Sequence, residues 1–160
     1  MVSYKNGDLF SSGCNVICHQ VNCKGVMNAG IAKTIRKKYP NVYKVFIASF
    51  CEKNNKLGNI DVVYIQQYHR FVMNMYAQSN YRHVGVVHTD YDAFRSCLKE
   101  IKTEINDYIS AHGSFGENGF KIGFPDHIGC GLAGGDWEVV KAIIEDEFSA
   151  DEWNVEIWKL

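Results

Sequence analysis

A glycine-rich loop near the C-terminus constrains the fold of this chain more than any other stretch. An apolar, strand-like run at residues 120–124 stops at Pro125, and four glycines then fall within seven positions: Gly129, Gly131, Gly134 and Gly135. A helical pattern of apolar residues follows, up to Phe148. A loop between a strand and a helix N-terminus presents unpaired backbone N–H groups and the positive end of the helix dipole. The pattern therefore predicts a phosphate-binding loop.

The spacing of these glycines does not predict a dinucleotide-binding fold, although Gly129, Gly131 and Gly134 match G-x-G-x-x-G. That fingerprint follows directly on a strand and needs an acidic residue about twenty positions later, at the end of a second strand. Here residues 125–128 intervene, and the 26 residues after Gly134 leave room for one helix and one strand. A Walker loop is excluded because no Lys-Ser/Thr pair follows the glycines. A phosphate loop of another type and a glycine-rich connection that binds nothing both remain open.

A second loop with the same setting lies at residues 22–30, where a strand-like run ends, glycines occur in a polar stretch, and a helix begins. Loops that follow parallel strands face the same edge of a sheet, where open α/β folds place ligands. Two such loops predict a ligand with a diphosphate and a sugar.

Composition sets the class of protein. The 160 residues are 46% hydrophobic and 22% charged, which is typical of one globular domain spanning residues 1–160. A formal net charge of −1 predicts no long-range field for nucleic acid or for a membrane surface, so local donors must hold an anionic ligand. No apolar run reaches membrane-spanning length.

The cysteines are spread out and do not predict a disulfide framework or a metal site. Without a signal peptide, reduced thiols and a cytoplasmic location are the expectation. The spacing of Cys14, Cys18, His19 and Cys23 does not fit a zinc site, so we expect no metal. The six cysteines are Cys14, Cys18, Cys23, Cys51, Cys97 and Cys130.

Strand-like and helical patterns alternate along the chain. Strands are expected at residues 2–5, 15–21, 60–65, 71–76, 120–124 and 153–158, with a hairpin joining the third and fourth. Helices are expected at residues 31–39, 40–53, 89–109 and 137–148, the third beginning with a capping box of Thr89 and Asp92. This alternation predicts an α/β fold with three layers, α/β/α, around a central mixed sheet.

Several short motifs, in this order, resemble the macrodomain family, particularly the branch of ADP-ribose 1''-phosphatases and terminal ADP-ribose protein glycohydrolases. The resemblance runs from about Tyr4 to Leu160 and implies that ADP-ribose binds at the sheet edge. The motifs are Gly7-Asp8-Leu9-Phe10, Cys18-His19-Gln20-Val21-Asn22, Asn28-Ala29-Gly30-Ile31-Ala32, Asn74-Met75-Tyr76-Ala77-Gln78, Thr89-Asp90-Tyr91-Asp92-Ala93-Phe94 and Ile128-Gly129-Cys130-Gly131-Leu132-Ala133-Gly134-Gly135-Asp136-Trp137.

The resemblance also implies roles for individual residues. Asp8 and Leu9 would lie at the adenine, with Trp158 and Leu160 closing over it. The distal ribose would be held by Asn22, Asn28, Ala29, Gly30 and Ile31. The diphosphate would be wrapped by His127, Ile128, Gly129, Cys130, Gly131, Leu132, Ala133, Gly134 and Gly135. Glycine amides can take phosphate oxygens, and asparagine can both donate to and accept from sugar hydroxyls.

The reacting end departs from the glycohydrolase pattern. The resemblance implies a lysine on the strand at residues 71–76, where this chain has Asn74 and Met75, and an aspartate at the position of Ala133. Apart from these two positions, the motifs resemble the phosphatases. That resemblance implies hydrolysis of an ADP-ribose derivative at its distal ribose.

In that reading His19 is an acid/base and Asp136 positions water, with no cofactor. His19 as a strand residue satisfied by a backbone carbonyl, and Asp136 as a helix cap, are the alternatives for these two side chains. A non-catalytic reader of ADP-ribose and a glycohydrolase without the lysine remain open, and ADP-ribosylated macromolecules are further expected partners.

Overall fold

The computed structural model describes residues 1–51, 56–81 and 85–160, and these form a six-stranded sheet in the order β1-β6-β5-β2-β4-β3. Only β3 runs antiparallel to its neighbour, and the other paired strands are parallel, so the predicted mixed sheet is confirmed. The strands are β1 (Val2–Asn6), β2 (Val16–Asn22), β3 (Ile60–Ile65), β4 (Arg70–Gln78), β5 (Lys121–Pro125) and β6 (Asn154–Lys159).

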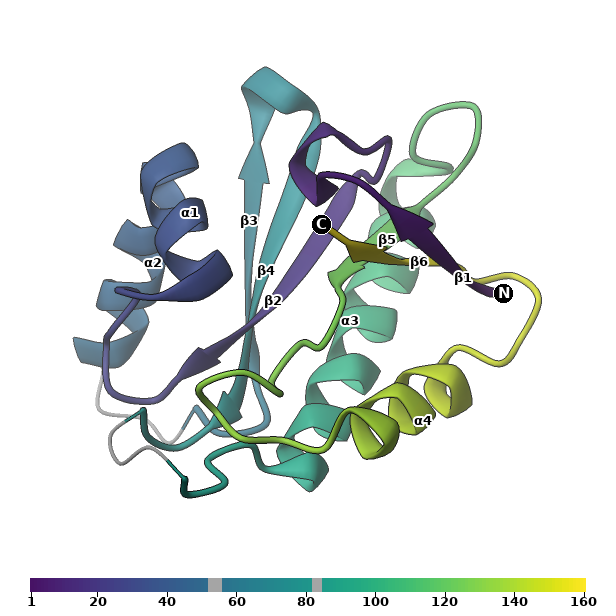
Figure 1. Ribbon diagram of the computed structural model, residues 1–160. Coiled ribbons are helices and arrows are strands. Elements are labelled where there is room, and N and C mark those ends of the chain that lie inside the picture. The colour runs from purple at the N-terminus through teal and green to yellow at the C-terminus, as the bar shows by residue number, and fades with distance from the viewer. Residues whose placement is uncertain (52–55, 82–84) are drawn as a thin grey trace.

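Helices cover both faces of the sheet, as the three-layer prediction requires. Figure 1 shows α1 (Gly30–Lys38) and α2 (Pro40–Cys51) on one face, with α3 (Tyr91–His112) and α4 (Trp137–Glu147) on the other. Short 3₁₀ turns lie at η1 (Leu9–Ser11) and η2 (Gln66–Tyr68). The part of the second helix expected beyond Cys51 falls on residues that the structure does not describe.

The larger core lies between the sheet and the pair α3 and α4. On α3, an apolar residue at every third or fourth position gives a buried stripe that faces the sheet: Phe94, Leu98, Ile101 and Ile105. Ile109 continues the same spacing but is exposed. None of the helices described in residues 1–51, 56–81 and 85–160 is long and apolar enough to cross a membrane.

The expected capping box at the start of α3 is wrong by one residue. The N-cap is Asp90, whose carboxylate accepts a hydrogen bond from the Ala93 N–H at 2.9 Å. The Thr89 hydroxyl instead donates to the Gly129 carbonyl at 2.6 Å. Thr89 therefore connects the start of α3 to the glycine-rich loop.

Strands β2 and β5 are parallel neighbours, with Val16 opposite Ile122 and Ile17 opposite Gly123. Their carboxyl ends therefore meet at one edge of the sheet, and the two glycine-bearing loops leave from that edge. The fold thus brings together the two loops that the sequence singles out.

Candidate functional site

A cavity of about 500 Å³ opens where β2 and β5 end, and residues from both loops line it. Its volume is within the range of small-molecule sites. Eleven of the residues expected at the ligand are among those that line it: Asn22, Asn28, Ala29, Gly30, Ile31, His127, Ile128, Gly129, Gly131, Leu132 and Ala133.

The N-terminus of α1 belongs to this cavity and has no side-chain cap. Gly30, Ile31 and Ala32 line the cavity, and Ala29 at the N-cap position offers no side-chain hydrogen bond. The first turns of α3 and α4, in contrast, are capped by the carboxylates of Asp90 and Asp136. An uncapped helix N-terminus leaves N–H donors for an anion.

The glycine-rich loop is fixed by hydrogen bonds to its own backbone and to the segment before α3. The Gly129 carbonyl accepts from the Thr89 hydroxyl at 2.6 Å and from the Gly135 N–H at 2.9 Å. The Ala133 carbonyl accepts from the N–H groups of His88, at 2.8 Å, and Thr89, at 3.2 Å. Gly129 and Gly134 have φ of +74° and +70°, a region that favours glycine. The loop is therefore held in one conformation beside the cavity.

Gln20 is a cavity residue that the sequence reasoning missed. Its amide Nε2 donates to Gln78 Oε1 and to Thr89 Oγ1, both at 2.9 Å, which joins β2, β4 and the segment before α3. Gln78 also lines the cavity. Asn74 and Met75, which stand where the resemblance implied a lysine, are buried and do not line it. The cavity residues that the sequence reasoning missed are Gln20, Val21, Val26, Ala32, Gln78, Tyr81, Pro125 and Asp126.

His127 and Asp126 form a dyad at the cavity. The His127 ring nitrogen Nδ1 lies 2.7 Å from Asp126 Oδ2, and the ring stacks on Trp137 with centroids 4.9 Å apart and planes 20° apart. His127 has φ of +57°, which is uncommon for a residue other than glycine. Both neighbours orient the ring, and an imidazole that donates from Nδ1 keeps Nε2 as a proton acceptor.

His19, expected to act as an acid or base, is fully buried and is not among the residues that line the cavity. Its Nε2 is 2.6 Å from the Asn74 side-chain oxygen, so its partner is a side chain rather than the backbone carbonyl considered as the alternative. Asn74 in turn donates to Asp61 at 3.0 Å. Burial lowers the pKa of His19 to about 4, and its Nδ1 has no hydrogen-bond partner among the described residues. In this structure His19 is part of a buried polar cluster.

The buried His19 predicts a loss of stability in mild acid. The unfolded chain binds a proton at a pKa of about 6.5, while the folded state resists protonation until about pH 4, so stability falls as the pH drops through this window. Between pH 7 and pH 5 this single group lowers the free energy of unfolding by about 2 kcal/mol. Urea unfolding of the wild type and His19→Gln at both pH values measures the difference, and an equal pH dependence in the two proteins would contradict it.

Asp136, expected to position water, has the geometry of a helix cap. Its Oδ1 accepts from the Glu138 N–H at 2.9 Å, and it is not among the cavity-lining residues. Cys130, Gly134 and Gly135 also belong to the loop without lining the cavity. Burial raises the pKa of the Cys130 thiol to about 11, which disfavours a nucleophilic thiolate.

The residues expected at an adenine lie outside the cavity lining. Asp8 caps η1, accepting from the Phe10 N–H and the Ser11 hydroxyl, and the bond from Ser11 lowers the pKa of its carboxyl. The Leu9 side chain is buried against Cys14 and Ile17, while Leu160 is 99% exposed. Their adenine roles, with that of Trp158, stay predictions.

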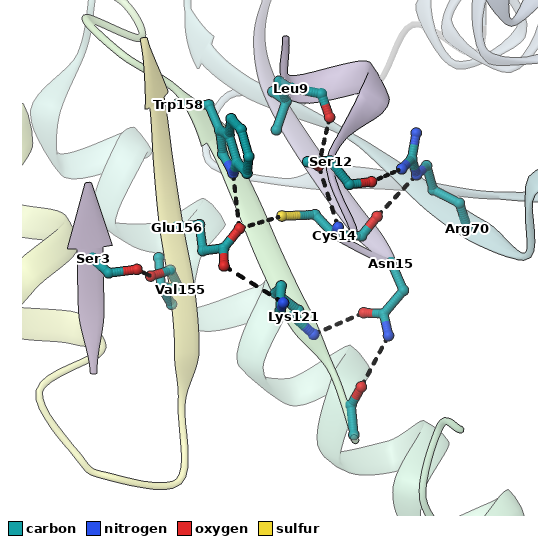
Figure 2. A network of polar contacts seen from close by, with 11 residues as sticks. Ser3, Leu9, Ser12, Cys14, Asn15, Arg70, Lys121, Val155, Glu156 and Trp158 are labelled. Atoms are coloured by element: carbon teal, nitrogen blue, oxygen red, sulfur yellow. Dashed lines mark hydrogen bonds and ion pairs between the residues drawn. The ribbon is translucent and has the colours of Figure 1, made fainter. Parts of the chain in front are cut away.

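A network of polar contacts holds η1 and the end of β6 (Figure 2). The Glu156 carboxylate accepts from the Trp158 indole at 2.9 Å and from the Cys14 thiol at 3.3 Å. Arg70 donates to the backbone carbonyls of Phe10, Ser12 and Cys14 at 2.8 to 2.9 Å. Trp158 is connected to the glycine-rich loop as well, because its carbonyl accepts from the Asp126 N–H at 2.8 Å.

Within residues 1–51, 56–81 and 85–160 there is no group of three or more His, Cys, Asp or Glu side chains placed to hold a metal ion.

The chain matches no family model, but it has relatives in sequence. It is 33% identical over 69 residues to an ADP-ribose 1''-phosphate phosphatase of Meyerozyma guilliermondii, a stretch that covers 40% of this chain and 39% of that protein. It is 26% identical to the ADP-ribose glycohydrolase OARD1 of Bos taurus, over 99% of this chain and 91% of that protein.

Solved structures share the whole fold. A protein of unknown function from Bacteroides thetaiotaomicron has a TM-score of 0.82 and 29% identity, over 100% of this chain and 98% of that one. The macrodomain of Mycobacterium tuberculosis DarG has a TM-score of 0.79 and 22% identity, over 99% and 97%. Thermosipho africanus DarTG in complex with ADP-ribose has a TM-score of 0.76 and 21% identity, over 96% and 40%. The strand order and this likeness together show that the chain has the macrodomain fold.

Proposed function

We propose that the chain binds ADP-ribose or a derivative in the cavity between its two glycine-bearing loops, and that residues 1–160 act as one macrodomain. The observation that carries the proposal is that these loops, far apart in sequence, line one cavity together with the uncapped N-terminus of α1. Backbone N–H groups there suit a diphosphate, and Asn22 and Asn28 suit ribose hydroxyls. The names of the relatives, a phosphatase and a glycohydrolase of ADP-ribose, support the same ligand.

We further propose that the cavity hydrolyses a group from the distal ribose, as an ADP-ribose 1''-phosphatase does. In this reaction a water oxygen bonds to phosphorus and gives up a proton to a base. The bond from phosphorus to the ribose oxygen breaks, and the ribose oxygen gains a proton from the resulting acid. The His127–Asp126 dyad suits these proton transfers better than His19, because His127 lines the cavity and His19 does not. Asp136 does not line the cavity either, so its role in positioning water stays a prediction.

A glycohydrolase activity on ADP-ribosylated macromolecules is a second candidate, supported by the likeness to OARD1 over nearly the whole chain. A lysine adduct does not enter it, because no lysine is among the described residues that line the cavity. A reader of ADP-ribose without turnover is the remaining alternative. The free thiols of Cys14, Cys18, Cys23, Cys97 and Cys130 support the reducing, cytoplasmic setting that we propose for all three.

Calorimetry with ADP-ribose tests the binding proposal, and no heat of binding at about millimolar concentration, the weak end of specific affinity, would refute it. Release of inorganic phosphate from ADP-ribose 1''-phosphate then separates the phosphatase from the reader. Release of ADP-ribose from ADP-ribosylated protein, measured in parallel, tests the glycohydrolase.

The two histidines can be separated by matched substitutions. His127→Gln is expected to lower kcat for phosphate release about 100-fold, the contribution typical of an acid/base group, while the affinity for ADP-ribose changes only a few-fold. His19→Gln is expected to leave kcat within about threefold, because the side chain is fully buried and does not line the cavity. Steady-state kinetics on both variants measure this, and the reverse order of effects would return the acid/base role to His19.

A further inference from the structure

The charges of this chain are strongly segregated, although they nearly cancel overall. Six of its 17 lysines and arginines, and none of its 18 acidic residues, lie between residues 9 and 51. Helices α1 and α2 carry five basic side chains and no acidic one, whereas α3 and α4 carry eight acidic and four basic side chains. Because these pairs cover opposite faces of the sheet, one outer layer is basic and the other is acidic on balance (Figure 1).

The basic side chains of this layer are all exposed: Lys24, Lys33, Arg36, Lys37, Lys38 and Lys44. We call the outer surface formed by these six residues the basic face. Two carboxylates from the described part of the chain approach it. Asp61 is buried behind α2 and hydrogen-bonded to Ser49, and Asp8 lies near Lys38. The basic face therefore keeps a positive local field that the net charge of −1 conceals.

Aromatic rings lie among these cations. The Arg36 guanidinium stacks over the Tyr43 ring at 4.0 Å, and the Lys38 ammonium lies 5.6 to 6.0 Å from the rings of Phe10, Tyr39 and Tyr68. Of these rings, Tyr68 is exposed, Phe10 and Tyr43 are partly exposed, and Tyr39 is buried, so Tyr68 is the ring most open to a base. Cations that pair with phosphates, beside rings on which bases can stack, are typical of surfaces that bind single strands. An acidic protein partner would pair with the cations but would not need the rings, so the rings favour a nucleic acid.

Arg36 joins the basic face to the cavity. Its Nη1 donates to Asn28 Oδ1 at 2.8 Å, and Asn28 lines the cavity. A polymer that lies along α1 therefore passes the mouth of the cavity.

We propose that the basic face is a docking surface for a single-stranded nucleic acid. Its phosphates pair with the exposed lysines and Arg36, and its bases contact the exposed ring of Tyr68 and the partly exposed ring of Phe10. One consequence rests on the proposed function: a strand docked there holds an ADP-ribosyl group attached to it at the mouth of the cavity.

Fluorescence anisotropy with an unmodified, labelled oligothymidylate tests the surface without any ADP-ribose. Binding by the wild type is expected to weaken with salt between about 50 and 200 mM, with a slope of log K against log salt of about −2, as three contacts to single-strand phosphates give. Lys33→Glu/Lys37→Glu/Lys44→Glu is expected to lose at least about tenfold in affinity and most of this slope.

The matched control is Lys5→Glu/Lys99→Glu/Lys141→Glu, which changes the net charge equally and alters β1, α3 and α4 instead. The oligonucleotide affinity of this control is expected to stay within about threefold of that of the wild type at the higher salt, where distant charges are screened. If the glutamate variant does not fold, Lys33→Gln/Lys37→Gln/Lys44→Gln replaces it, with a smaller loss in the same direction.

Equal losses in the two triple variants, no binding by the wild type at low salt, or equally good displacement by polyglutamate would each overturn the proposal. Calorimetry with ADP-ribose is run on the same proteins. If the protein binds the oligonucleotide but not ADP-ribose, the proposed function is refuted and the docking surface is retained. If it binds ADP-ribose but not the oligonucleotide, the docking surface is refuted and the proposed function is retained.

Discussion

Arg70→Met is expected to lower the free energy of unfolding by about 3 kcal/mol, because one buried and two partly buried carbonyl groups lose their charged donor together. The Arg70 guanidinium is buried, and it donates to the backbone carbonyls of Phe10, Ser12 and Cys14 and to the Tyr39 hydroxyl. No carboxylate pairs with it among the described contacts, so it stabilises the loop after η1 through these carbonyls. Urea unfolding at neutral pH measures the loss.

Arg95→Met is the matched control. Arg95 forms ion pairs with Asp146 and Glu147 at 2.5 and 2.8 Å, but its side chain is 36% exposed, so its loss is expected to cost at most about 1 kcal/mol. Arg70→Lys keeps the charge but lacks the planar arrangement of donors. Its loss in free energy of unfolding is expected to lie between those of Arg70→Met and Arg95→Met. A loss for Arg70→Met no larger than that for Arg95→Met would show that the carbonyl groups find other donors.

Gly129→Ala is expected to reduce the affinity for ADP-ribose at least tenfold, with a cost in stability of about 1–2 kcal/mol from its left-handed backbone. The φ of Gly129 is +74°, and a Cβ there would lie 2.6 Å from Gln20 Oε1 and 3.1 Å from Thr89 Oγ1. The new methyl group must displace Gln20, which connects β2 to Gln78 and Thr89. The loop carbonyl held by Thr89 then moves, and with it the N–H groups around the cavity. Calorimetry with ADP-ribose measures the change.

Gly13→Ala serves as the control for this substitution. The nearest atom that its Cβ would meet is Lys121 Nζ, at 3.9 Å, which is ordinary contact, and Gly13 is not among the glycines with positive φ. Its affinity for ADP-ribose and its stability are expected to match those of the wild type. Unchanged ADP-ribose binding by Gly129→Ala would mean that the ligand does not depend on the conformation of this loop.

The fold could be predicted from the sequence because the alternation of elements, the hairpin and the two loops all indicated the same arrangement. The β/α alternation predicted the layers, the hairpin predicted an antiparallel pair of strands, and the two glycine loops predicted a shared edge of the sheet. All three are confirmed. The error at the start of α3 arose because Thr89 and Asp90 can each cap a helix, and a contact with Gly129, forty residues away, decides between them.

The cavity was harder to predict because neighbouring residues of a strand point to opposite faces. His19 and Gln20 are adjacent and both polar, and the sequence does not indicate which of them faces the cavity. The structure assigns Gln20 to the cavity lining and buries His19 beside Asn74. Gln78 was missed for a related reason, because the strand was expected to end at residue 76 and β4 continues to Gln78. The roles of the individual site residues stay predictions.

The position of β6 in the sheet has a consequence for how the chain folds. β6 lies between β1 and β5, and β1 pairs with β6 from Val2 opposite Val155 to Asn6 opposite Lys159. Strand β1 therefore gains its partner only after all the residues between it and β6 have been synthesised. Contacts this distant in sequence close slowly, so β1 is the element that must stay unpaired longest during synthesis. Completion of this edge of the sheet thus waits until β6 has left the ribosome.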